Sequence, residues 1–215
     1  AVLIGSTFQC DAVSEAIQKY LSNIPVFIAN GYLDLPNVYG IITDDRGGVK
    51  SCVQLLANKD CKHIAYLYDY DTPSNRLKGE GFKDGIRVSE EEKKIKIKNQ
   101  IKGIGYGMEN WIESIRTLLI ENPTIDGIIA SEDRIAISAI KVITSLGKKV
   151  PEDIKVVGIN NSDLGKIYTP SLTSLDSMWE AINSTTARNL VNALQDGHII
   201  KKVLVYAKII EREST

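Results

Sequence analysis

The stretch from Leu146 to Asp163, LGKKVPEDIKVVGINNSD, constrains the fold of this chain more than any other. Gly147 suits the left-handed residue that ends a helix, and Pro151 prevents the helix from continuing because proline lacks a backbone N–H. The apolar residues of Ile154–Ile159 do not alternate with polar ones, which predicts a strand covered on both faces, as in a parallel sheet. Asn160 and its neighbour follow at the carboxyl end of that strand, where open α/β sheets bind ligands. The stretch therefore predicts a binding site.

Strand-like and helix-like segments alternate along the chain, which predicts right-handed β-α-β units and parallel sheets in an α/β fold. The predicted strands are Ala1–Ser6, Ile24–Ala29, Val38–Ile42, His63–Tyr68, Lys93–Lys102, Asp126–Ala130, Ile154–Ile159 and Lys201–Ile210. In Lys93–Lys102, isoleucines alternate with lysines, so we expect an exposed edge strand whose charges disfavour pairing with another chain. Since Ala1 enters a strand directly, we also expect that the chain lacks its natural N-terminal part.

Composition and charge exclude several classes of protein. A net charge of −1 argues against a chain that grips nucleic acid by itself, because such chains present a basic face. No apolar run approaches the roughly 18 residues of a membrane span, and the start shows no signal peptide. Three cysteines without metal-like spacing predict reduced thiols in a cytoplasmic protein.

The sequence offers no catalytic machinery. His63 and His198 are the two histidines, both expected at the surface, and no G-x-S-x-G motif marks a nucleophile. No histidine, cysteine and carboxylate spacing matches a metal site. We therefore expect no enzyme, no metal and no cofactor.

Polar residues at the predicted carboxyl ends of strands are the stronger signal. Asp69, Ser131–Asp133 and Asn160 each follow a different strand. Any one of them could be a helix cap or a turn residue. On a parallel sheet, however, all of them would line one crevice.

Three further residues could take part, each with a structural alternative. Arg76 could donate in a fork to a ligand, or it could form a surface salt bridge. Tyr106 and Trp179 could stack on the apolar face of a ligand, or they could pack within the protein.

Several strings of this sequence resemble one known family. VPEDIKVVGINN followed by YTPSLTSL resembles the strand and crossover of LacI–GalR transcriptional regulators. IPVFIANGYLDLPN, ITDDRGGVKSCVQLL, SNRLKGEGF and DGIIASEDRIAISAIKVI resemble the same family in the same order, so the match covers nearly the entire chain.

The resemblance implies an effector-binding domain with the type I periplasmic-binding-protein-like fold. That fold has two Rossmann-like lobes with parallel sheets, joined by three crossovers, with the ligand between them. The implied lobes are residues 1–42 with 177–206, an incomplete N-terminal lobe, and residues 43–176 with 207–215. The implied crossovers lie near Ile42–Asp44, Leu175–Ser177 and Tyr206–Lys208.

The resemblance also implies a ligand site. The matching residues are Asn30, Arg76, Tyr106, Glu132, Asn160 and Trp179, with Asp133 as a helix-capping aspartate behind the site. The family's GFDD pattern is GINN here, so amides replace carboxylates. Because an amide both donates and accepts while a carboxylate only accepts, the hydrogen bonding offered to a ligand differs.

By the same resemblance, the chain senses a small molecule, a sugar or a sugar derivative, for a homodimeric regulator. That regulator would bind operator DNA through an N-terminal helix-turn-helix head absent from this chain. The alternative is a secreted or periplasmic sugar-binding protein of a transport system, which shares the fold. The PEDI and SLTSL strings and the free cysteines favour the regulator.

Overall fold

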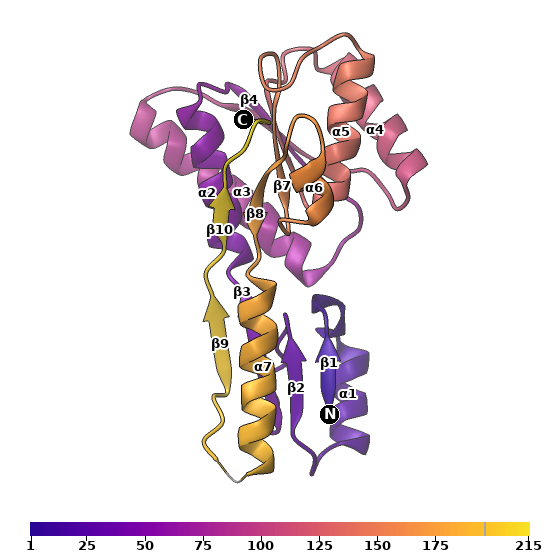
Figure 1. The fold of residues 1–215 in the computed structure, drawn as a ribbon, viewed down its shortest axis with the longest axis vertical. Helices are drawn as coiled ribbons and strands as arrows, with labels where there is room; N and C mark the ends of the chain where they lie inside the picture. The colour runs from indigo at the N-terminus through magenta and orange to yellow at the C-terminus, as the bar shows by residue number, and fades with distance from the viewer. Residues whose placement is uncertain (196) are drawn as a thin grey trace. The chain divides into compact units, whose positions relative to one another are not determined.

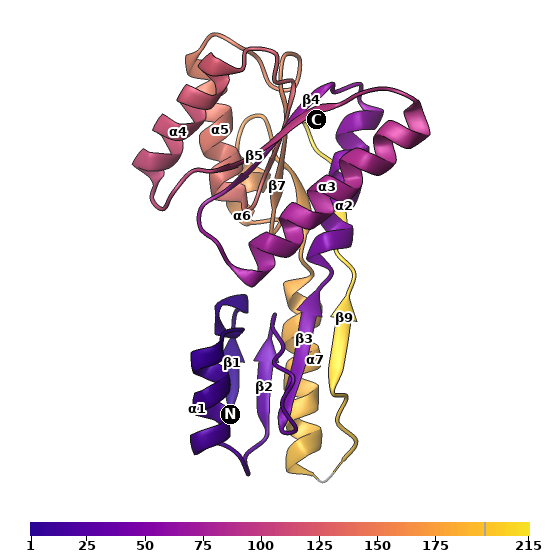
Figure 2. The same ribbon diagram turned by 180° about the vertical axis from the view of Figure 1, so that it is seen from behind.

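The structure, a computed structural model, describes residues 1–195 and 197–215. They form two compact units. The first unit contains Ala1–Asp44, Thr72–Ser74 and Met178–Tyr206, and the second contains Asp45–Asp71, Asn75–Ser177 and Ala207–Thr215. Apart from the short segment Thr72–Ser74, the chain passes between the units after Asp44, after Ser177 and after Tyr206. Most elements of both units are labelled in Figures 1 and 2.

The first unit is a parallel sheet with a helix on each face. Its strands are β1 (Val2–Ile4), β2 (Val26–Ala29), β3 (Val38–Thr43) and β9 (Lys202–Val205), in that spatial order. Ile17 of α1 (Asp11–Tyr20) packs with Val26 and Ile28, whereas Ile182 of α7 (Trp179–Leu194) packs with Ala29 and Ile41. Because alternate residues of a strand face opposite sides, β2 needs apolar residues at every position, and all four are buried.

The second unit is a larger doubly wound sheet with the order β10-β8-β7-β6-β4-β5. Its strands are β4 (His63–Tyr68), β5 (Lys98–Gly103), β6 (Gly127–Ala130), β7 (Lys155–Ile159), β8 (Thr173–Asp176) and β10 (Lys208–Ile210). Its helices are α2 (Asp45–Asn58), α3 (Pro73–Lys93), α4 (Met108–Glu121), α5 (Asp133–Ser145) and the short α6 (Asp163–Ile167). One apolar core lies under α2 and α3, and another lies under α4 and α5.

Two predicted strands differ from those observed. Lys201–Ile210 forms two strands, β9 in the first unit and β10 in the second, and β10 pairs antiparallel with β8. The reason is topological: β8 runs towards the exit of the chain from the second unit, and β10 follows directly on its return. Lys93–Lys102 shortens to Lys98–Gly103 because α3 continues to Lys93, but β5 is an edge strand of the described sheet, as expected.

The prediction for His63 was wrong. Its side chain is buried, and Nδ1 lies 2.8 Å from Thr124 Oγ1. β4 lies between β5 and β6, so even its first residue is covered. The expected exposure of His198 is confirmed.

No helix within residues 1–195 and 197–215 is long and apolar enough to cross a membrane.

Candidate functional site

The candidate site is the carboxyl edge of the second unit's sheet, defined here as the residues that follow β4, β6, β7 and β8. These strands are parallel and lie side by side in the order β8-β7-β6-β4, so their ends meet at one edge. The residues concerned are 69–71, 131–133, 160–162 and 177, together with Asp176 at the end of β8.

After β7 the chain takes an unusual path through two consecutive residues with positive φ. The φ angle is 98° at Asn160 and 50° at Asn161, in the region that asparagine tolerates better than most residues. The Asn160 N–H donates to Leu175 O at 2.8 Å, and Ser177 Oγ donates to Asn160 Oδ1 at 3.0 Å. Among the described residues, nothing accepts from Asn160 Nδ2, which leaves a donor for a ligand.

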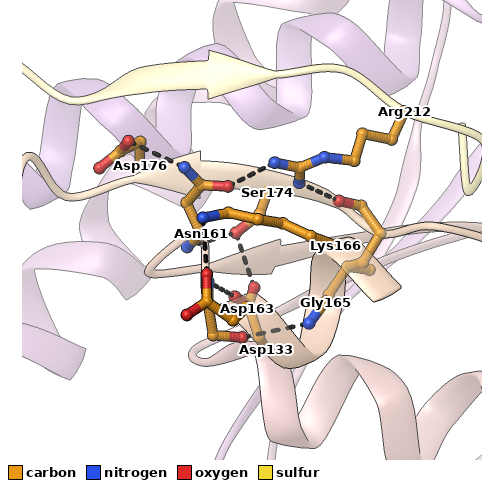
Figure 3. A network of polar contacts seen from close by, with 10 residues as sticks. Asp133, Asn161, Asp163, Gly165, Lys166, Ser174, Asp176 and Arg212 are labelled. Carbon is orange, nitrogen blue, oxygen red and sulfur yellow. Dashed lines mark hydrogen bonds and ion pairs between the residues drawn. The ribbon is translucent and has the colours of Figure 1, made fainter. Parts of the chain in front are cut away.

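Asn161 turns its side chain into a polar network instead, as Figure 3 shows. Its Nδ2 donates to Asp176 Oδ2 at 3.0 Å, and its Oδ1 accepts from Arg212 Nη2 at 2.5 Å. Its backbone N–H donates to Ser174 Oγ at 2.9 Å. The loop after β7 is thereby fixed to β8 and to the segment after β10.

Asp133 was expected to cap α5, and that expectation was wrong. The N-cap of α5 is Glu132, which makes no side-chain capping bond. The buried Asp133 carboxylate instead accepts from Ser174 Oγ and from the Ser162 N–H, both at 2.6 Å. A Cβ on Gly158 would lie 2.2 Å from Asp133 Oδ1, so this position requires glycine. Asp133 therefore supports the loop after β7 from behind.

Glu132 presents a half-buried carboxylate at the end of β6. Among the described residues it has no hydrogen bond and no ion pair. Burial raises the pKa of Glu132, and the nearby charge of Asp69 raises it further, while Arg134 and Lys78 oppose both effects. A carboxylate without protein donors can accept from the hydroxyl groups of a ligand.

An aromatic pair lies beside these carboxylates. The rings of Tyr70 and Tyr106 meet edge to face with centroids 5.9 Å apart, and Tyr106 is 74% exposed. Burial raises the pKa of Tyr70, and the charges of Asp69 and Glu132 raise it further. Tyr106 is thus connected to the surroundings of Glu132 through Tyr70, and its exposed ring offers an apolar face.

Arg76 forms the surface ion pair that was the alternative to ligand binding. Its Nε and Nη2 each donate to the Asp71 carboxylate at 2.8 Å, and both side chains are exposed. It lines a groove of about 320 Å³ with Tyr66, Tyr68 and Ile101 among others, and Glu132 and Asn160 are not part of that lining. The ion pair holds the pKa of Asp71 below its usual range through the hydrogen bond from Arg76.

Lys78 was not among the predicted site residues and lies two residues beyond Arg76 on α3. Lys78 is 8% exposed, and its Nζ lies 3.4 Å from Ser131 O and 3.9 Å from Asp45 Oδ1. A signal was available: Lys78 precedes the buried Phe82 by four residues, which places both on the inward face of the helix, whereas Arg76 is off that face.

The remaining two predicted site residues belong to the first unit. Asn30 follows β2 with a φ of 60°, and its N–H donates to Ile41 O at 2.7 Å. Trp179 begins α7 and lines an apolar groove of about 310 Å³ with Val2, Ile4 and others. The structure therefore gathers Glu132, Tyr106 and Asn160 around one sheet edge, places Arg76 in the neighbouring groove, and leaves Asn30 and Trp179 in the other unit.

The described residues hold no cluster of three or more histidine, cysteine or carboxylate side chains that could bind a metal ion. The chemistry of the edge is that of hydrogen-bond donors and acceptors beside aromatic rings.

Comparisons with known proteins identify the family and the fold of the chain. An HTH-type transcriptional regulator of Lachnoclostridium phytofermentans is 27% identical over the whole chain, which covers 64% of that protein. The ribose operon repressor of Halalkalibacterium halodurans is 27% identical over 90% of the chain and 57% of the repressor. The chain thus spans about 60% of the length of these relatives. Both relatives are named as transcriptional regulators rather than as enzymes.

The fold is that of solved regulator structures. The structure of a complex of the transcriptional regulator CelR with cellobiose matches all of this chain and 65% of its own, with a TM-score of 0.84 and 20% identity. The family of periplasmic binding protein-like domains matches residues 53–215. Its resemblance to the LacI–GalR group implied this fold and relatives that are regulators, and both are confirmed. The chain belongs to the family of periplasmic binding protein-like domains.

Proposed function

We propose that this chain is the ligand-sensing domain of a transcription regulator and that its ligand is a sugar or a sugar derivative. The observation that supports the proposal most is the half-buried Glu132 carboxylate, which has no hydrogen bond or ion pair among the described residues and lies on the same sheet edge as the amide of Asn160. We infer that these two polar groups are ligand contacts.

The chemistry of the edge suits a polyhydroxylated ligand. A sugar hydroxyl both donates and accepts, so it can donate to Glu132 and accept from Asn160 Nδ2. The exposed Tyr106 ring would cover the apolar face of the sugar ring. The ribose operon repressor and the CelR–cellobiose complex among the relatives support this ligand class.

The proposed contacts from the second unit are Arg76, Tyr106, Glu132 and Asn160, with Lys78 supporting the end of β6. Arg76 must leave Asp71 to reach a ligand, and exposed ion pairs of this kind are weak. Asn30 and Trp179 of the first unit stay predicted ligand contacts on the basis of the family resemblance. A ligand that binds one conformation of the protein more tightly than another would shift their populations, which is the condition for a switch.

The parent protein is proposed to bind operator DNA through a helix-turn-helix head as a homodimer in the cytoplasm. The relatives named as HTH-type regulators support this. A coupling of about 1–3 kcal/mol between ligand and DNA would make a useful switch. No enzymatic activity is proposed. The alternative, a sugar-binding protein of a transport system, has the same fold, and the regulator relatives favour the sensor.

A binding screen tests the proposal. Thermal shift of the chain should reveal a ligand in a panel of pentoses, hexoses and disaccharides that includes ribose and cellobiose. A ligand at about 100 times its Kd adds roughly 2.7 kcal/mol to stability. Titration calorimetry should then show weaker binding by Asn160→Ala, Glu132→Gln and Arg76→Ala. The matched control is Arg87→Ala, at an exposed ion pair on the same helix as Arg76. Unchanged affinity in all three site variants would reject the site.

A further inference from the structure

Asn160 can serve a ligand only if its amide is held in place, and its own contacts are few. Asn160 and the following Asn161 both have positive φ angles, so the position depends on what holds the loop. The Ser162 N–H is held by Asp133, and the Asn160 N–H by Leu175 O. Between them lies Asn161, whose side chain points into the network of Figure 3.

The Asn161 amide bridges two groups of opposite charge. Its oxygen accepts from the guanidinium of Arg212 at 2.5 Å, and its nitrogen donates to the carboxylate of Asp176 at 3.0 Å. The amide fits both neighbours, since one requires an acceptor and the other a donor, whereas a carboxylate offers no donor. An aspartate at this position would keep the bond from Arg212 but would place its carboxylate against that of Asp176.

Arg212 is itself anchored on two sides. Its Nη1 donates to Leu172 O at 2.5 Å, and its backbone N–H donates to Thr173 Oγ1 at 2.8 Å. The guanidinium therefore joins the start of β8 to the loop after β7, while Asp176 joins the end of β8 to the same loop. A lysine could not make both side-chain bonds, because it lacks the planar fork.

We propose that Asn161 and Arg212 are positioning residues: they fix the Asn160 amide for the ligand without touching the ligand. This inference rests on the proposed function, because it takes Asn160 as a ligand contact. It also accounts for the asparagine in GINN, since the carboxylate of the family's GFDD pattern would have no donor for Asp176.

A reversal of the hydrogen bond tests the proposal. Asn161→Asp should weaken binding of the best sugar from the panel by roughly tenfold or more, the usual cost of removing a residue that orients a ligand contact. The double variant Asn161→Asp with Asp176→Asn restores one amide and one carboxylate with their roles exchanged. It should therefore recover most of the lost affinity. Asn99→Asp, on the exposed edge strand β5, is the matched control and should bind as the original protein does.

Hydrogen exchange of the ligand-free protein provides a second readout that requires no sugar. Asn161→Asp and Arg212→Gln should speed exchange of the amides at Asn160 and Ser162, and the double variant should restore their protection. Faster exchange together with weaker binding supports the proposal. Unchanged exchange, or a double variant that recovers neither property, overturns it. If exchange responds as expected but Asn160→Ala leaves affinity unchanged, the ligand site is wrong and the positioning role falls with it, although the network itself stands.

Discussion

Replacement of Asp133 by alanine is the sharpest test of how the candidate site is supported. The carboxylate is 2% exposed and receives hydrogen bonds from Ser174 Oγ and from the Ser162 N–H, both at 2.6 Å. In Asp133→Ala both donors lose their acceptor in a place where little water can reach them. The loop after β7 would then lose its connection to α5.

The magnitude follows from the two bonds. A hydrogen bond to a charged group contributes about 1.5–3 kcal/mol, so two of them amount to about 3–6 kcal/mol. Water that enters the space left by the carboxylate recovers part of this. We therefore expect Asp133→Ala to lower the free energy of unfolding of the second unit by about 3–5 kcal/mol, a large share of the usual 5–15 kcal/mol.

Urea denaturation followed by circular dichroism measures this loss. The two units can unfold in separate transitions, so the comparison should use the transition of the second unit. Asp163→Ala is the matched control, because its side chain is 94% exposed and, among the described residues, its ion pair is with Lys166 of the same short helix α6. The control should leave the transition midpoint unchanged. If Asp133→Ala is as harmless as Asp163→Ala, the supporting role of Asp133 is refuted.

Two further predictions concern α3 and the end of β6. A Cβ on Gly81 would lie 2.2 Å from Arg46 O, so Gly81→Ala should destabilise the protein by about 3 kcal/mol in urea denaturation. A Cβ on Gly79 would lie 4.0 Å from its nearest neighbour, so Gly79→Ala should instead stabilise α3 by about 0.5–1 kcal/mol. Equal effects of Gly79→Ala and Gly81→Ala would contradict the close packing of Gly81 against Arg46. The pKa of Glu132 is raised in the folded protein, so above the ordinary carboxyl value of 4.5 the folded state binds more protons than the unfolded chain. The charged Glu132 therefore lowers the free energy of unfolding at neutral pH. Glu132→Gln should raise that free energy at pH 7, and the gain should vanish as pH falls below 4.5. A gain that does not depend on pH would argue against this burial effect.

Much of the fold could be predicted because burial on both faces leaves a clear pattern in the sequence. Ile154–Ile159 is apolar without alternation, and Lys155–Ile159 is a central strand covered on both sides. The direction of β10 could not be predicted, because a three-residue strand has no pattern that distinguishes parallel from antiparallel pairing. His63 was misplaced because the cover over β4 comes from residues distant in sequence, such as Thr124.

The site was predicted less well than the fold, for a physical reason. Strand ends can be located from sequence, so Glu132 and Asn160 were found at the carboxyl edge. The direction of a side chain on a helix depends on which face is buried, and the resemblance gave Arg76 where the structure buries Lys78. Asp133 was assigned to its own helix because its partners, Ser162 and Ser174, are 29 and 41 residues away.

The central claim is that a sugar binds at the carboxyl edge of the second unit's sheet. Mapping of backbone amide shifts by NMR during titration with the sugar that binds best tests this most directly. The account predicts that the largest shifts occur at residues 69–71, 131–133 and 160–162, with little change at the opposite end of the same strands. Saturable shifts confined to that opposite end, or to the outer faces of the helices, would contradict it.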